Sequence, residues 1–191
     1  MTADPYVDPE SGVLRNRLGI VDADLLRRVE SDLSFAALAD LGTRILPGSY
    51  DLDHLRAFHR EIFGDLFFWA GEIRVVGIAK SDPFCLPQHI EPYSADVFDG
   101  LAKERYLQGC TRTEFIERLT HYFSEVNAIH PFREGNGRTQ RAFFRQLGRE
   151  AGWDIDWASL DRDDNIRASI ASVRGNNAPL GDLLASLIRQ V

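Results

Sequence analysis

The residue types best suited to catalysis are concentrated between His130 and Arg141. A histidine has a pKa suited to general-base work near neutral pH, a glutamate binds metal ions, and arginines bind phosphates. Glycines allow a backbone to approach a phosphate closely. The candidate site residues are His130, Glu134, Gly135, Asn136, Gly137, Arg138 and Arg141.

Two helices must position these residues. Apolar residues recur at steps of three or four ahead of the stretch, which predicts a buried helix: Phe115, Ile116, Leu119, Phe123, Val126 and Ile129. Pro131 disfavours helical backbone at His130, so this helix is expected to end there. A second helix is expected over 138–148. The turn from Gly135 to Gly137 then lies at a helix N-terminus, where free N–H groups and the helix dipole form an anion site.

The predicted chemistry is transfer of a nucleotidyl or phosphoryl group. Glu134 is a candidate Mg²⁺ ligand, because Mg²⁺ commonly takes one or two carboxylates and completes its shell with phosphate oxygens. His130 is the candidate base for the attacking nucleophile. Each feature alone is weak evidence, since a single Gly-x-Gly or a row of arginines is common. Walker A and dinucleotide fingerprints do not fit, because Gln140 stands where the latter needs a third glycine.

The stretch resembles the Fic family signature His-x-Phe-x-Asp/Glu-Gly-Asn-Gly-Arg-x-x-Arg at every defined position. The run from His54 to Arg74 also resembles a Fic segment. The resemblance implies an all-α Fic fold and transfer of AMP from ATP to a protein hydroxyl. It further implies roles for the motif residues: His130 as general base, Phe132 as buried loop anchor, Glu134 as Mg²⁺ ligand, Gly135, Asn136 and Gly137 as anion hole, and Arg138 and Arg141 as ligands of the outer phosphates.

Composition indicates one globular domain over residues 1–191. The chain is 44% hydrophobic and 27% charged, with a net charge of −7, which argues against broad nucleic-acid binding. Cys85 and Cys110 are expected to be free thiols in a reducing cytoplasm. No apolar run is long enough to span a membrane, and no signal-peptide core is present. A cytoplasmic protein is therefore expected.

Outside the motif, residues 1–19 are expected to form an extended or weakly ordered arm. Helices are expected over 22–41, with Asp22 as N-cap and a possible break near Ser34, and from Asp51, also an N-cap, to Ile62, with His59 as a hydrogen-bonded core residue. Further helices are expected over 92–106, 163–173 and 179–188. The joint at 174–177 is a C-cap turn or, alternatively, reaches the adenine or ribose.

Residues 73–86 differ from the expected helices, because a β-prone run precedes a turn-like sequence. This pattern predicts a short hairpin, which is either a connector or a flap beside the active-site loop. As a flap, its exposed edge at Val75, Val76, Gly77 and Ile78 would pair with an extended segment of a target protein. Family resemblance favours the flap.

Many Fic proteins are restrained by a helix with the pattern Ser/Thr-x-x-x-Glu-Gly/Asn, whose glutamate pairs with the second motif arginine, here Arg141. In this chain Glu134 alone precedes Gly or Asn, and His130 stands four residues before it. The chain thus resembles the Fic toxins held by a separate small antitoxin, a subclass that targets type II DNA topoisomerase subunits. Residues 8–20 also resemble the start of such toxins. Two alternatives stay open: transfer of another group such as phosphate, and a nucleotide-binding interaction module.

Overall fold

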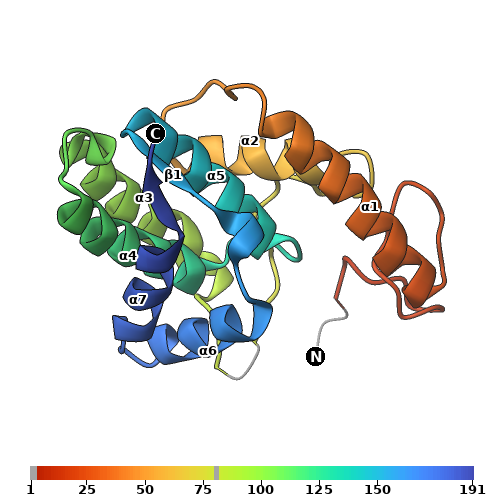
Figure 1. Ribbon diagram of the computed structural model, residues 1–191. Coiled ribbons are helices and arrows are strands. Elements are labelled where there is room, and N and C mark those ends of the chain that lie inside the picture. The colour runs from red at the N-terminus through yellow and green to blue at the C-terminus, as the bar shows by residue number, and fades with distance from the viewer. Residues whose placement is uncertain (1–3, 80–81) are drawn as a thin grey trace.

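The computed structural model describes residues 4–79 and 82–191, and helices dominate these ranges (Figure 1). Two short 3₁₀ helices, Arg105–Leu107 and Trp157–Ser159, accompany them. The α-helices are α1 (Ala23–Leu41), α2 (Leu52–Phe63), α3 (Pro87–Lys103), α4 (Arg112–Ile129), α5 (Asn136–Glu150), α6 (Arg162–Val173) and α7 (Ala178–Leu187). The predicted all-α class is confirmed.

Side-chain caps fix where several helices begin. Asp22 accepts the Leu25 N–H and Asp51 accepts the His54 N–H, as expected from the sequence. Thr111 opens α4 with a capping box that Glu114 completes. The suggested break near Ser34 is wrong: α1 is continuous, because the Ser34 hydroxyl donates to the Ser31 carbonyl one turn earlier and leaves the helix intact.

The third helix differs from its predicted range, 92–106. It begins at Pro87, where a missing N–H costs nothing, and Pro92 lies inside it. It ends at Lys103 because Arg105, Tyr106 and Leu107 all have positive φ (53°, 55° and 64°), which no α-helix accommodates.

Helices α4 and α5 form the centre of the core, and α2, α3 and α7 pack around them (Figure 1). The predicted face of α4 is buried, except that Ile116 is only partly covered. Phe143, Phe144 and Leu147 of α5 are each 0% exposed. The two motif helices are therefore held rigidly, and their junction is a fixed site.

A small sheet was not predicted. Strands β1 (Trp153–Ile155) and β2 (Ile188–Gln190) pair antiparallel, with Ile155 opposite Ile188. Ile188 was expected in the last helix, but α7 ends at Leu187. The pairing ties the end of the described chain to the segment after α5.

The N-terminal arm is ordered from residue 4 onward, so the expectation of weak order is wrong for this part. Val7 and Leu14 form an antiparallel bridge, and the Arg15 N–H donates to the Tyr6 carbonyl at 2.8 Å. Tyr6 and Val13 are 7% and 8% exposed and join the core cluster around Phe67 and Trp69. Burial of these two side chains offsets the entropy lost in ordering the arm.

The segment 73–86 reverses direction beside the end of α4. Its described residues form one antiparallel bridge, Ala79 with Pro83, and the Phe84 N–H donates to the Ile78 carbonyl at 3.2 Å. Lys80 and Ser81, part of the predicted turn, lie outside the described residues. The flap is thus a narrow loop with a single bridge rather than two regular strands. The Cys85 N–H donates to the Ala128 carbonyl at 3.0 Å and pins it to α4.

Candidate active site

The motif occupies the junction between α4 and α5. His130 is the C-cap of α4 and has left-handed backbone (φ 47°, ψ 62°), as the following proline requires it to leave the helix. The loop then turns at Gly135, the N-cap of α5. The predicted end of the first helix and start of the second helix are close to those observed.

Asn136 closes the loop from inside. Its Oδ1 accepts the Phe132 N–H at 2.9 Å, and its Nδ2 donates to the Phe132 carbonyl at 2.7 Å. Phe132 itself is 1% exposed and its ring stacks on His59 at 4.0 Å, so its expected role as the loop anchor is confirmed. Because the Asn136 side chain is used within the loop, the part of this residue left to meet an anion is its N–H.

His59 supports the same loop from α2. Its Nδ1 accepts the Gly71 N–H at 2.8 Å, so its Nε2 carries the proton and donates to the Glu134 carbonyl at 2.9 Å. Burial lowers the pKa of His59 to about 4, with smaller contributions from Arg138 and Arg60. The ring is neutral at pH 7, and the prediction of a hydrogen-bonded core histidine is confirmed.

The turn at the start of α5 has the geometry of an anion cradle. Gly135 has φ 81°, and a Cβ there would lie 2.3 Å from the Phe63 ring, so no other residue fits. As the first helical residues, Asn136, Gly137 and Arg138 have N–H groups with no carbonyl one turn earlier in the helix. These groups and the helix dipole favour a phosphate at this point.

His130 lies beside the cradle with its ring oriented by neighbours on both sides. Its Nδ1 is 3.2 Å from the Asn127 carbonyl, which can only accept, so Nδ1 carries the proton in the neutral ring. The lone pair is then on Nε2, as a general base requires. Phe84 of the flap stacks on the imidazole with ring centroids 3.7 Å apart.

The first motif arginine has partners that sequence reasoning missed. Arg138 donates to Glu30 at 2.5 Å and to Ser34 at 2.9 Å, both on α1, and its guanidinium lies over the Phe63 ring. Glu134 accepts the Gly135 N–H at 3.0 Å and lies 3.9 Å from Arg138. Its carboxylate is 46% exposed at the edge of the cradle.

A cavity of about 180 Å³ lies beside His130 and the start of α5. Its walls include His130, Gly137 and Arg141 from the motif and Asp82 and Phe84 from the flap. Phe123 and Asn127 of α4 and Gln140 of α5 also line it. A further wall comes from α6, which the sequence did not point to: Asn165, Ile166, Ser169, Ile170 and Val173.

The suggestion that 174–177 reaches the adenine or ribose is not supported by this arrangement. Arg174 pairs with Asp82 at 3.3 Å. Gly175 and Asn177 line a different cavity, beside Cys85 and Tyr93. Arg174, the first residue of the joint, is the C-cap of α6, so the alternative of a C-cap turn agrees with the structure.

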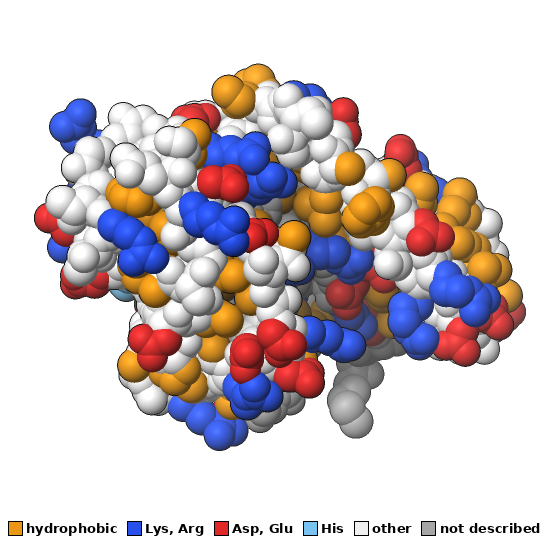
Figure 2. Space-filling model, in the orientation of Figure 1, with side chains coloured by type: hydrophobic (Ala, Val, Ile, Leu, Met, Phe, Trp, Pro, Cys, Tyr) orange, Lys and Arg blue, Asp and Glu red, His pale blue; other side chains and the backbone are white. Residues whose placement is uncertain are grey.

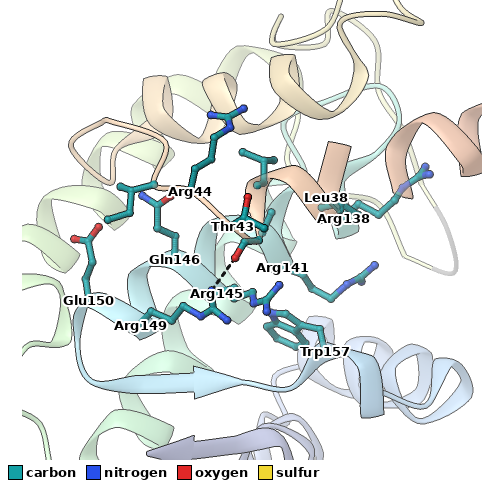
Figure 3. A pocket seen from close by; sticks show the side chains of 14 residues that line it. Leu38, Thr43, Arg44, Arg138, Arg141, Arg145, Gln146, Arg149, Glu150 and Trp157 are labelled. Atoms are coloured by element: carbon teal, nitrogen blue, oxygen red, sulfur yellow. Dashed lines mark hydrogen bonds between the residues drawn. The ribbon is translucent and has the colours of Figure 1, made fainter. Parts of the chain in front are cut away.

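A larger cavity of about 650 Å³ lies on the other side of α5, against the end of α1. Arg141, Arg145 and Arg149 follow one another along the α5 side that faces it (Figure 3). Figure 2 shows basic side chains gathered between α1 and the body of the molecule. Arg141 lines both this cavity and the one that holds His130. Burial and the nearby Arg138 lower the pKa of Arg141.

Two relatives are similar to this chain over nearly its whole length. The chain is 46% identical, over 98% of its length, to the protein adenylyltransferase VbhT of Bartonella schoenbuchensis (strain DSM 13525 / NCTC 13165 / R1), and it spans 38% of that relative. It is 35% identical, over 98% of its length and 93% of the relative, to the probable protein adenylyltransferase Fic of Escherichia coli (strain K12).

Solved structures of similar fold carry nucleotides. The BepC effector of Bartonella tribocorum with bound AMPPNP matches with a TM-score of 0.90 and 25% identity, covering 97% of both chains. The N-terminal Fic domain of a Bep effector from Bartonella quintana with bound ADP matches with a TM-score of 0.90 and 28% identity, covering 97% of this chain and 94% of that one.

The fold and site define a helical domain with a histidine beside a glycine turn at one helix junction. A model of the Fic/DOC family matches residues 49–147, and the chain belongs to this family. The predicted resemblance is confirmed. So is the enzyme class at the level of the family, since relatives similar over nearly the whole chain are named adenylyltransferases.

Proposed function

We propose that this protein transfers AMP from ATP to a Ser, Thr or Tyr hydroxyl of a target protein. The observation that carries the proposal is that one cavity brings together the base His130, the cradle residue Gly137 and Arg141. The nucleotides bound in the neighbouring structures support ATP as the donor.

In the proposed complex the phosphates lie on the α5 N-terminus, with Arg138 and Arg141 on the outer phosphates. The nucleoside lies on the α6 side, where Asn165 and Ser169 offer hydrogen bonds and Ile166 and Ile170 offer apolar contact. This placement leaves Nε2 of His130 at the α-phosphate.

The proposed reaction is an in-line displacement. Nε2 of His130 takes the proton of the target hydroxyl while its oxygen forms a bond to the α-phosphorus. The bond from the α-phosphorus to the bridging oxygen breaks, and pyrophosphate leaves with the electron pair. The imidazolium then returns its proton to solvent. N–H groups at the start of α5 stabilise charge on the transferring group.

Mg²⁺ is part of the proposal. Among the described residues no cluster of three or more His, Cys, Asp or Glu side chains could hold a metal by itself. A single carboxylate at the edge of a phosphate cradle suits Mg²⁺, which keeps several waters and takes phosphate oxygens. Glu134 would hold the ion, which neutralises triphosphate charge.

Target binding is proposed at the flap residues Val75, Val76, Gly77 and Ile78. The Val76 and Ile78 carbonyls accept bonds from Arg74 and Phe84 within the protein. Val75 is 68% exposed, and a Cβ at Gly77 would meet nothing within 4 Å. We therefore place the pairing edge at Val75 and Gly77. The Val75 N–H bonds to the Tyr6 hydroxyl at 3.1 Å, so a target strand would replace this bond.

Inhibition by a separate antitoxin is also proposed. Because Arg141 lines both cavities, a glutamate entering the larger one reaches Arg141 from the α1 side and competes with phosphate. Arg145 Nε and Trp157 Nε1 are buried there and have no hydrogen-bond acceptor among the described residues. They are donors that an acidic helix with the pattern Ser/Thr-x-x-x-Glu-Gly/Asn would satisfy.

The resemblance to antitoxin-held toxins supports a role as a growth-inhibiting toxin, with type II DNA topoisomerase subunits as proposed targets. A cytoplasmic site of action fits the two free thiols, Cys85 and Cys110. Within the described residues no helix is both long and apolar enough to cross a bilayer. Expression of the chain alone should slow growth, and co-expression of a protein with the antitoxin pattern should restore it.

Mass spectrometry of purified topoisomerase subunits, incubated with the protein, Mg²⁺ and ATP, tests the activity. An added AMP group on a hydroxyl is expected. His130→Ala should lower the rate by a factor of about 10² to 10⁴ while ATP binding persists. An added phosphate would favour the alternative transferase, and nucleotide binding without any transfer would favour an interaction module. Equal rates for wild type and His130→Ala would remove the assigned base.

A further inference from the structure

Arg74 is a charged residue in the interior at the start of the flap. It is 1% exposed, and no carboxylate pairs with it in the ranges 4–79 and 82–191. Burial lowers the pKa of its guanidinium. A buried charge without an ionic partner is strongly unfavourable unless hydrogen bonds satisfy it, so the hydrogen bonds of Arg74 must account for its burial.

The guanidinium donates to four backbone carbonyls. Nε donates to His130 at 2.7 Å, and NH2 donates to Ile129 at 3.2 Å and to Cys85 at 2.5 Å. NH1 donates to Val76 at 2.8 Å. One side chain thus joins the last residues of α4 to both halves of the flap. The planar fork of arginine spans these positions, whereas the point charge of lysine does not.

The bond to His130 falls on a strained residue. Left-handed backbone at a residue other than glycine is strained and persists only where its surroundings enforce it. The Arg74 Nε bond holds the carbonyl of this peptide, and the Arg74 N–H donates to the next carbonyl, Pro131, at 2.9 Å. Arg74 therefore acts on the conformation that aims the imidazole.

We propose that Arg74 is a positioning residue that couples the flap to the catalytic base. A target strand bound along Val75 and Gly77 orders the flap, and Arg74 passes this order to the His130 peptide. Transfer is then fastest when a target occupies the flap. This inference rests on the proposed AMP transfer. It assigns a role to Arg74, which lies outside the motif from His130 to Arg141.

The test compares Arg74→Lys with Arg56→Lys, a matched control. Arg56 also donates to a main-chain carbonyl, that of Gly71 at 2.8 Å, but makes no contact with the motif. We expect Arg74→Lys to lower kcat for AMP transfer about 10- to 100-fold, with KM for ATP within about twofold of wild type. The imidazole NMR signals of His130 should broaden or split, because the peptide is no longer held. Arg56→Lys should leave kcat and these signals unchanged.

Two results would overturn the proposal: an unchanged kcat in Arg74→Lys, or an equal loss in Arg56→Lys, which would indicate general destabilisation. If wild type transfers no AMP, the proposed function itself fails, so the two failures are distinct. If Arg74→Lys does not fold, hydrogen exchange on the wild-type protein still tests the coupling. Hydrogen exchange at the Arg74 and Cys85 amides should report one opening event, with protection factors within about threefold of each other. Independent opening of these amides would also overturn the coupling.

Discussion

Glu30 of α1 accepts a hydrogen bond from Arg138 of α5 at 2.5 Å, although the two residues lie 108 positions apart in the chain. Burial raises the pKa of Glu30, and the Arg138 charge opposes this shift. The carboxylate therefore occupies a guanidinium that we assign to an outer phosphate. It adds negative charge at the place that we propose for the triphosphate.

We expect Glu30→Gln to tighten ATP binding about threefold to tenfold, because the amide keeps the acceptor oxygen but removes the repelling charge. Binding of AMP, which lacks the outer phosphates, should not change. Calorimetric titration with both nucleotides tests this. Glu61→Gln is the control. Glu61 also pairs with an arginine, Arg44, at 2.5 Å, but this pair does not involve a motif residue. Weaker ATP binding in Glu30→Gln would mean that the carboxylate orients Arg138 instead of competing for it.

Glu134→Ala should weaken the Mg²⁺-dependent part of ATP binding. With Mg²⁺ present the affinity should fall about tenfold, and excess Mg²⁺ should restore it only in part, because phosphate oxygens still bind the ion. Without Mg²⁺ the variant and wild type should bind alike. Glu117→Ala, at an exposed position of α4, serves as the control. A variant that keeps the full Mg²⁺ effect would place the metal elsewhere.

Gly77→Pro should impair target labelling while nucleotide binding survives. Proline removes the N–H that an added strand needs, and Gly77→Ala keeps it in open space. We expect target labelling to fall at least about tenfold in the proline variant and to stay within about twofold in the alanine variant. Rates are measured with labelled ATP and a purified target. If both variants label the target normally, the flap does not bind it through its main chain.

The stability of the protein should fall as the pH drops from 6.5 toward 4. The folded-state pKa of His59 is about 4 against an ordinary 6.5, so the unfolded chain binds more protons between these values. His59 contributes roughly 3 kcal/mol to the free energy of unfolding. This contribution is fully present above pH 6.5 and is lost as the pH falls from 6.5 to 4. Burial lowers the pKa of His54 as well, which acts in the same direction.

Urea unfolding at a series of pH values measures this dependence. His59→Gln should flatten the slope of unfolding free energy against pH between 4 and 6.5, apart from the part due to His54. His121→Gln, at an exposed histidine, should leave the slope as in wild type. An equal slope in His59→Gln and wild type would show that His59 does not titrate differently in the folded state.

The sequence by itself determined the motif, the two helices around it and the chemistry of their junction. These inferences depend on signals that lie close together in the chain: the spacing of apolar residues, Pro131 after His130, and the glycines at 135 and 137. Local backbone preferences set such features, so they are visible before the chain folds. The caps Asp22 and Asp51 were predictable for the same reason.

Only the tertiary structure decided what surrounds that junction. The contact of Arg74 with His130 spans 56 positions. The α6 wall of the cavity is separated from the motif in the chain by the rest of α5 and by β1. A carbonyl acceptor carries no sequence signature, because every residue has one, so the partners of Arg74 depend wholly on packing. Strands of three residues, like β1 and β2, are too short to show a period. The order of the arm likewise depends on Tyr6 finding Trp69, a contact that exists only once the chain has folded.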